Sequence, residues 1–80
     1  MSKIGAILSV IEGEHCMGVD GLRDYHIAST VRDAGRIRDP HKRFRTIQLA
    51  LTNYAVTVTW MVDNNEVRVR NNANTKEVYL

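Results

Sequence analysis

The chain has few of the sequence features that mark disulfide-rich, secreted or membrane proteins. It contains one cysteine, Cys16, and one proline, Pro40, among 80 residues. A single cysteine excludes an intrachain disulfide, which is typical of a reducing compartment. No apolar run approaches the roughly 18 residues of a membrane span, and only Lys3 precedes a short apolar run near the N-terminus. We therefore expect a cytoplasmic protein with neither a secretory signal nor a membrane segment.

Recognisable catalytic motifs are also lacking. There is no glycine-rich phosphate loop, no paired-carboxylate spacing and no Gly-x-Ser-x-Gly elbow. His15 and Cys16, preceded by Glu12 and Glu14, are a weak fragment of a zinc or Cys-His site, because zinc needs four ligands and a nucleophilic pair needs an orienting group. The simpler interpretation is a loop with incidental polar residues. We expect no enzymatic activity, metal or cofactor.

The length of the chain limits it to one domain. A domain of 80 residues, 44% of them hydrophobic, can fold alone but has a thin stability margin. Burying more apolar surface between two copies would widen that margin. A homodimer is therefore expected.

Positive charge is present in modest excess, but its distribution is uneven. The net charge is +2. Six of the eleven basic residues fall within 14 positions, namely Arg32, Arg36, Arg38, Lys42, Arg43 and Arg45. This asymmetry favours a polyanionic partner over a charge that serves solubility alone. The opposing interpretation is a solvated face in which Asp33 and Asp39 pair with the arginines.

The strongest local signal lies at Asp39-Pro40. Aspartate at a helix cap and proline at the first helical position predict a helix that continues to about Asn53. Its inner face would carry Phe44, Ile47, Leu51 and Tyr54, with Lys42, Arg45, Thr46 and an exposed Leu49 on the opposite face. Apolar residues also alternate between positions 47 and 51, so residues 43–51 could instead form a strand in a small β-rich domain.

Two further helices are predicted before the one that begins at Asp39-Pro40. Residues 2–12 follow the helical spacing, with Ser2 as cap and Gly13 as stop, although residues 4–10 also alternate. Residues 13–21 should form a loop, from which Asp20 caps a helix that stops at Gly35. That helix has apolar residues on two sides and would have to be buried between neighbours, or a short strand replaces it. The two sides are Leu22 with Tyr25, and Ile27 with Val31 and Ala34.

From residue 55 onward, apolar residues recur at every second position, the spacing of a β-strand. Residues 55–62 and 66–70 predict a hairpin, joined by a turn at 63–65, with Val56, Val58, Trp60 and Val62 towards the core. Thr57, Thr59 and Met61 would form an outer face suited to a dimer contact. Lys76–Leu80 either adds a short third strand or frays.

The predicted fold class is therefore α+β, with three short helices followed by a C-terminal β-hairpin. This is the order of winged helix-turn-helix modules, in which the third helix enters the major groove of DNA. A small regulator that binds double-stranded DNA is thus one hypothesis. Its candidate contacts are Arg36, Arg38, His41, Lys42, Arg43, Arg45, Thr46, Arg68 and Arg70. Gln48 is placed nearer the core boundary and is rated below Arg45 for base contacts.

A different class of function remains open. Arg36, Arg38, Arg68 and Arg70 could line a site for an anionic ligand or a protein partner in a small oligomeric interaction or inhibitor protein. Recognition of RNA is also open, since Phe44 and Tyr54 could stack bases if they were not in the core.

Overall fold

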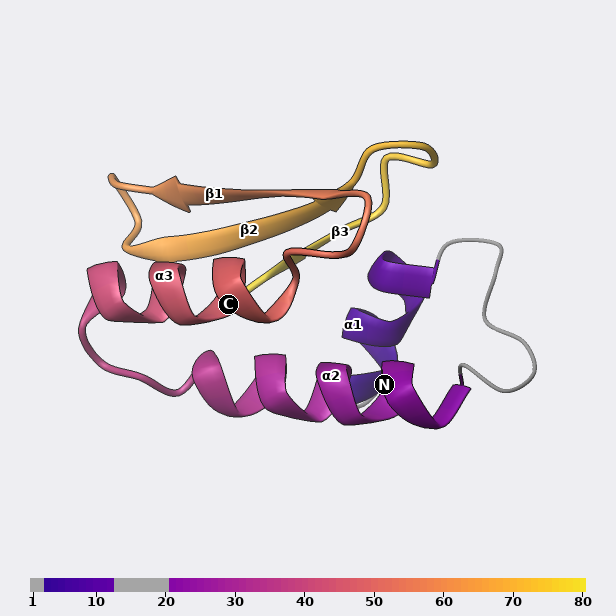
Figure 1. Cartoon of the computed structure of the whole chain (residues 1–80). Coiled ribbons are helices and arrows are strands. Elements are labelled where there is room, and N and C mark those ends of the chain that lie inside the picture. Colours follow the sequence, from indigo (N-terminus) through magenta and orange to yellow (C-terminus); the bar gives the residue numbers. More distant parts are fainter. Residues whose placement is uncertain (1–2, 13–20) are drawn as a thin grey trace.

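The chain folds as a small α+β domain, with three helices followed by a three-stranded antiparallel sheet. This arrangement, in a computed structural model that describes residues 3–12 and 21–80, is drawn in Figure 1. The elements are α1 (Lys3–Glu12), α2 (Gly21–Ala34), α3 (Pro40–Ala50), β1 (Val56–Met61), β2 (Glu66–Asn71) and β3 (Glu77–Tyr79). The predicted class and order of elements are confirmed.

The sheet is a meander with the strand order β1-β2-β3. Val58 lies opposite Val69, and Val69 lies opposite Val78, so these three side chains share one face. The three helices lie on one side of the sheet (Figure 1), where Val67, Val69 and Val78 are buried. Among the described residues, no helix covers the other face.

The core lies between this sheet face and the helices. Each helix contributes a short apolar stripe, and the central strand contributes two valines. The buried apolar residues are Ile7, Val10, Ile11, Ala28, Val31, Ala34, Ile47, Leu51, Val67, Val69 and Val78. Within residues 3–12 and 21–80, no helix has the length and apolar character needed to cross a bilayer.

The first two helices form where the sequence predicts them. In α1, Ile7 and Ile11 are buried and Ile4 packs against the core, which confirms the helical spacing over the alternating one. α2 is a helix and not a short strand. The expected loop at 13–20, with the His15-Cys16 pair and the Gly13 and Asp20 end signals, lies outside the described residues, as does Ser2.

The expectation that α2 is buried on two sides is wrong. Leu22 is 85% exposed and Tyr25 is also exposed, while Ala28, Val31 and Ala34 are buried. α2 therefore packs through one stripe only. Leu22 and Tyr25 do not indicate a second buried face, because exposed apolar residues are common on the surfaces of folded proteins.

α3 is a helix and not a strand. The Asp39 carboxylate accepts a hydrogen bond from the His41 amide at 3.0 Å, and Pro40 stands at the first helical position. The predicted end at Asn53 is wrong, since the helix ends at Ala50. Beyond it the backbone changes to tighter turns, in which the Thr52 amide donates to the Leu49 carbonyl at 3.4 Å and the Tyr54 amide to the Leu51 carbonyl at 3.0 Å.

The predicted hairpin forms, with Met61 opposite Glu66 and a turn in which Asn65 has φ of 53°. Two details of its inner face differ from expectation. Val62 lies beyond the end of β1 and is 67% exposed. Trp60 is only partly buried and packs beside Phe44, outside the main core cluster. The optional third strand is present as β3, with Val78 buried.

Candidate nucleic-acid interface

The exposed face of α3 brings together basic, amide and apolar side chains. His41, Lys42, Arg45, Gln48 and Leu49 are all exposed. They lie on one side of the helix because Ile47 and Leu51 anchor the other side in the core. The helix contains no acidic residue, and the positive end of its dipole lies at the same end as Lys42. The face is therefore electropositive at its start.

Arg43 fixes the position of this helix instead of facing solvent. Its guanidinium donates one hydrogen bond to the Ile37 carbonyl at 2.9 Å and another to the Asn65 carbonyl. The first contact holds the connector between α2 and α3, and the second holds the β1–β2 turn. Arg43 thus ties the start of α3 to the tip of the hairpin.

An aromatic cluster supports the same end of α3 from the sheet. The rings of Phe44 and Trp60 are stacked, with centroids 6.4 Å apart. The exposed His41 ring meets Trp60 edge-on at 5.8 Å. Trp60 therefore lies directly behind the first turn of α3. As the only tryptophan in the chain, it can report on events there.

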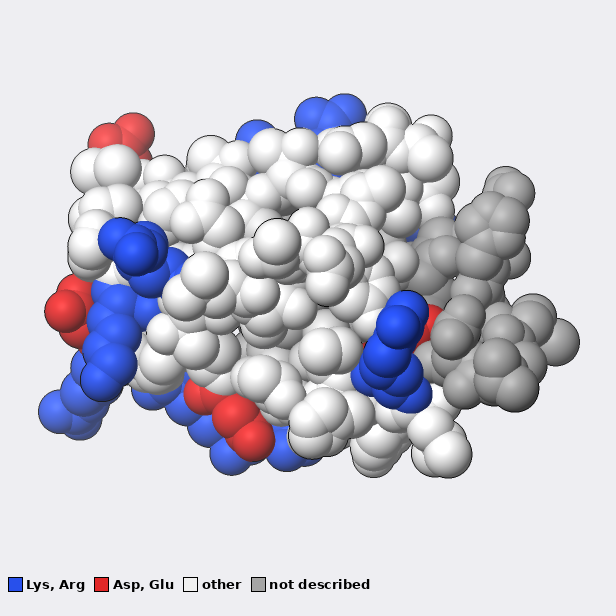
Figure 2. Space-filling view, in the orientation of Figure 1, with Lys and Arg blue, Asp and Glu red and all other residues white. Residues whose placement is uncertain are grey.

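The connector between α2 and α3, residues 35–39, adds two exposed cations, Arg36 and Arg38. Acidic side chains lie among them. The Asp33 carboxylate is 3.9 Å from the Arg36 guanidinium, while the Asp39 carboxylate caps α3. Figure 2 shows Lys and Arg atoms gathered at this end of the molecule with red carboxylates between them, and a mostly uncharged surface across the middle.

The predicted contact residues do not form one continuous surface. Arg68 lies opposite Thr59 and Tyr79, and Arg70 lies opposite Thr57 and Glu77. Their neighbours Val67 and Val69 face the helices, so both arginines point to the uncovered face of the sheet. The sheet separates them from the exposed face of α3. Of the remaining candidates, Thr46 is partly buried and its hydroxyl donates to the Lys42 carbonyl at 2.8 Å.

Gln48 is the site residue that the sequence interpretation undervalued. It is exposed beside Arg45, whereas it was expected near the core boundary. Successive helical residues are about 100° apart. This spacing puts Gln48 at the edge of the stripe formed by Phe44, Ile47 and Leu51, so spacing alone does not decide whether it faces the core or solvent.

The described residues offer no site for a metal ion, since no three His, Cys, Asp or Glu side chains gather in ranges 3–12 and 21–80. Comparison with protein families, curated proteins and solved structures finds no match to this chain. The candidate interface therefore has to be assessed from its own geometry and charge.

Proposed function

We propose that this protein is a small regulator that binds double-stranded DNA through the exposed face of α3. The observation that carries the proposal is the grouping of Lys42, Arg45 and Gln48 on one exposed face of a capped helix without acidic residues. Arg36 and Arg38 extend this positive surface along the connector. Winged-helix-type docking, with α3 in the major groove, uses these groups.

The residue types on this face match the chemistry of base edges. An arginine can donate two hydrogen bonds to guanine, and a glutamine can pair in the same way with adenine. Arg45 and Gln48 take these roles, while Leu49 contacts a thymine methyl group. Lys42 and Arg38 bind phosphates and release counterions from the DNA.

The hairpin positions the helix in this proposal. Arg43 joins α3 to the hairpin turn, so the turn and the helix meet DNA as one rigid unit. The turn carries an exposed Asp63, which disfavours a phosphate at the tip itself. Arg68 and Arg70 lie on the far face of the sheet and belong outside the DNA surface.

The arrangement of α2 and α3 differs from a tight helix-turn-helix. The two helices run in opposite directions in Figure 1 and are joined by residues 35–39. Helix-turn-helix motifs join their helices at a steep angle through three or four residues. The proposal therefore rests on the exposed face of α3 and not on that motif.

The test is duplex binding measured by fluorescence anisotropy over a range of salt concentrations. We expect affinity to fall steeply with salt, and the double variant Lys42→Ala/Arg45→Ala to bind at least about tenfold more weakly. The control, Arg68→Ala/Arg70→Ala, removes the same charge from the far face and should bind like the wild type. Equal losses in both variants, or no binding at low salt, would refute the proposal.

The alternative is an oligomeric interaction protein with an arginine-lined site. A single chain does not assemble that site from the four expected arginines, because Arg36 and Arg38 lie at the connector and Arg68 and Arg70 on the far sheet face. A second copy would have to bring the two pairs together.

A further inference from the structure

A pocket lies where the start of α1, the end of α2 and the C-terminal strand meet. It has a volume of about 320 Å³. This is close to the lower limit of pockets that hold small molecules, about 300 Å³. Segments far apart in the sequence build its wall, which consists of Lys3, Arg32, Gly35, Arg36, Glu66, Tyr79 and Leu80.

Three cations from separate parts of the chain converge on this pocket. The Arg32 side chain comes from the last turn of α2, Arg36 from the connector and Lys3 from the start of α1. With Asp33 beside the pocket and Glu66 in its wall, the positive side chains outnumber the negative ones by one. The sequence interpretation considered Arg36 alone of these three as part of an anion site.

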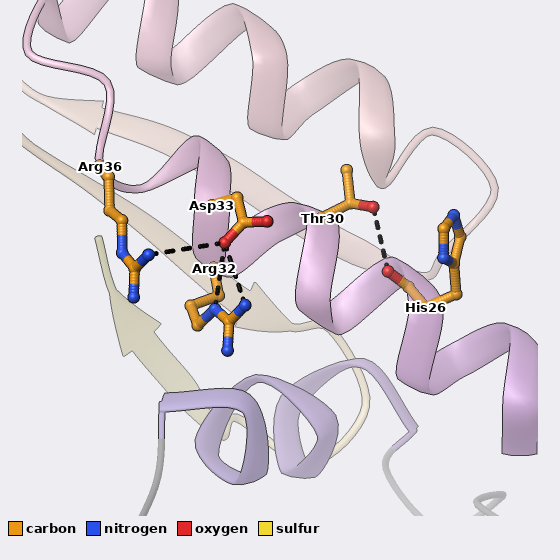
Figure 3. Close-up of polar contacts among 5 residues, drawn as sticks. All are labelled: His26, Thr30, Arg32, Asp33 and Arg36. Atoms are coloured by element: carbon orange, nitrogen blue, oxygen red, sulfur yellow. Dashed lines mark hydrogen bonds and ion pairs between the residues drawn. The ribbon is translucent and has the colours of Figure 1, made fainter.

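Asp33 orients the two arginines. One of its carboxylate oxygens accepts from Arg32 Nε at 3.2 Å and Arg32 Nη2 at 3.1 Å, and lies 3.9 Å from Arg36 Nη1. Figure 3 shows both guanidinium groups held at this carboxylate, on the side of α2 that faces α1. The contacts engage one edge of the Arg32 fork and leave its Nη1 donors for a ligand.

The floor of the pocket is tightly packed. A Cβ atom at Gly35 would lie 3.2 Å from the Arg32 carbonyl oxygen and 3.3 Å from Leu80 Cδ2, so only glycine fits there without displacement. The Leu80 amide donates to the Val67 carbonyl at 2.8 Å, which fixes Leu80 to the sheet. The cations therefore lie beside a closely packed, partly apolar surface.

We infer that this pocket binds a small organic phosphate. Arginine forks suit the tetrahedral oxygens of phosphate, and the Leu80 surface suits an apolar group attached to it. Lys3 supplies a third charge; its ammonium donates only a long 3.4 Å bond to the Tyr79 carbonyl. The inference does not rest on DNA binding, because Arg32 and Lys3 lie outside the proposed DNA surface, although Arg36 belongs to both sites.

Phenyl phosphate is a suitable probe, added to the ¹⁵N-labelled full chain at constant ionic strength. We expect saturable shifts of the Gly35, Arg36 and Leu80 amides. Arg32→Ala should weaken binding of the probe about tenfold, as expected for loss of a charged hydrogen bond. Arg32→Lys, which keeps the charge without the fork, should give an intermediate loss in a fully folded chain.

The matched control is Arg70→Ala, which removes an exposed arginine of β2 that lies outside both the pocket and the proposed DNA surface. It should bind the probe like the wild type. Shifts that grow linearly without saturation, or equal weakening of probe binding by Arg70→Ala and Arg32→Ala, would overturn the inference. Neither result tests duplex binding, so the two proposals can fail separately.

Discussion

At the scale of single residues, a buried carboxylate joins α2 to the chain that follows α3. Asp24 is buried, and its carboxylate accepts a hydrogen bond from the Tyr54 hydroxyl at 2.6 Å. Burial of the phenol, together with this bond and the charge of Asp24, raises the pKa of Tyr54 to about 12. The pair lies 30 positions apart in the sequence, so no local pattern announces it.

This pair predicts a loss of stability at alkaline pH. The folded pKa of Tyr54 lies above its unfolded value of 10.0, so the contribution is complete below pH 10 and is lost as pH rises towards about 12. Thermal unfolding of the wild type should therefore show a decline in Tm across this window. Tyr54→Phe should show a smaller decline, whereas Tyr25→Phe, at an exposed position, should follow the wild type. Identical profiles for wild type and Tyr54→Phe would contradict this assignment.

A buried asparagine fastens α1 to the sheet. Asn71 Nδ2 donates to the Val10 carbonyl at 2.7 Å, in the last turn of α1, where carbonyls have no partner within the helix. Its Oδ1 accepts from the amides of Ala73 and Asn74. A helix cap supplied from 61 positions away has no local signature.

Loss of this side chain should destabilise the fold. Asn71→Ala leaves a buried carbonyl and two turn amides without their partner, and we expect a loss of about 1–3 kcal/mol in the free energy of unfolding. Chemical denaturation of the purified variant measures it. The neighbouring Asn72→Ala, at an exposed position, should change stability by less than about 0.5 kcal/mol. Similar losses in both variants would remove the special role of Asn71.

At the scale of elements, α3 shows what local chemistry can predict. Its start follows from Asp39 and Pro40, because the hydrogen bond of an N-cap and the fixed φ of proline both act within a few residues. Its end depends on the backbone turn that leads to β1, which has no clear local signal, so the end was predicted too late. Arg43 illustrates the same limit, since its partners Ile37 and Asn65 belong to other elements.

Arg43 should be a structural residue. Arg43→Ala removes both links to the connector and the hairpin turn, and we expect a loss of about 1–3 kcal/mol in unfolding free energy. Arg45→Ala, on the exposed face of the same helix, should change stability by less than about 0.5 kcal/mol while weakening duplex binding. Denaturation followed by Trp60 fluorescence measures both variants. Equal stability of the two would show that Arg43 is not needed to hold the helix.

At the scale of the whole molecule, the fold was more predictable than the site. Periodicity and caps identify elements one at a time, and the order of elements gives the class. The distribution of the basic residues depends on which sheet face packs against the helices. That packing separates Arg68 and Arg70 from Lys42 and Arg45, and it brings Lys3, at the start of the chain, to Tyr79 near its end.

The uncovered sheet face is where we predict a homodimer contact. It carries Thr57, Thr59 and Met61 on β1 and the arginines of β2. Thr57→Glu removes the exposed hydrogen bond from the Thr57 hydroxyl to Asn72 Oδ1 but places a carboxylate opposite Arg70, so it changes this face with little effect on the fold. Sedimentation equilibrium should show a dimer for the wild type and a larger monomer fraction for the variant. A wild type that stays monomeric at high concentration would contradict the prediction.

The central claim is that the exposed face of α3 is the DNA surface. Titration of the ¹⁵N-labelled protein with a short duplex at low salt tests it most directly. The account predicts saturable amide shifts concentrated in residues 41–49 and in the connector 35–39, with a parallel change in Trp60 fluorescence. Shifts confined to the outer sheet face around Arg68 and Tyr79, or no saturable shifts at all, would contradict it.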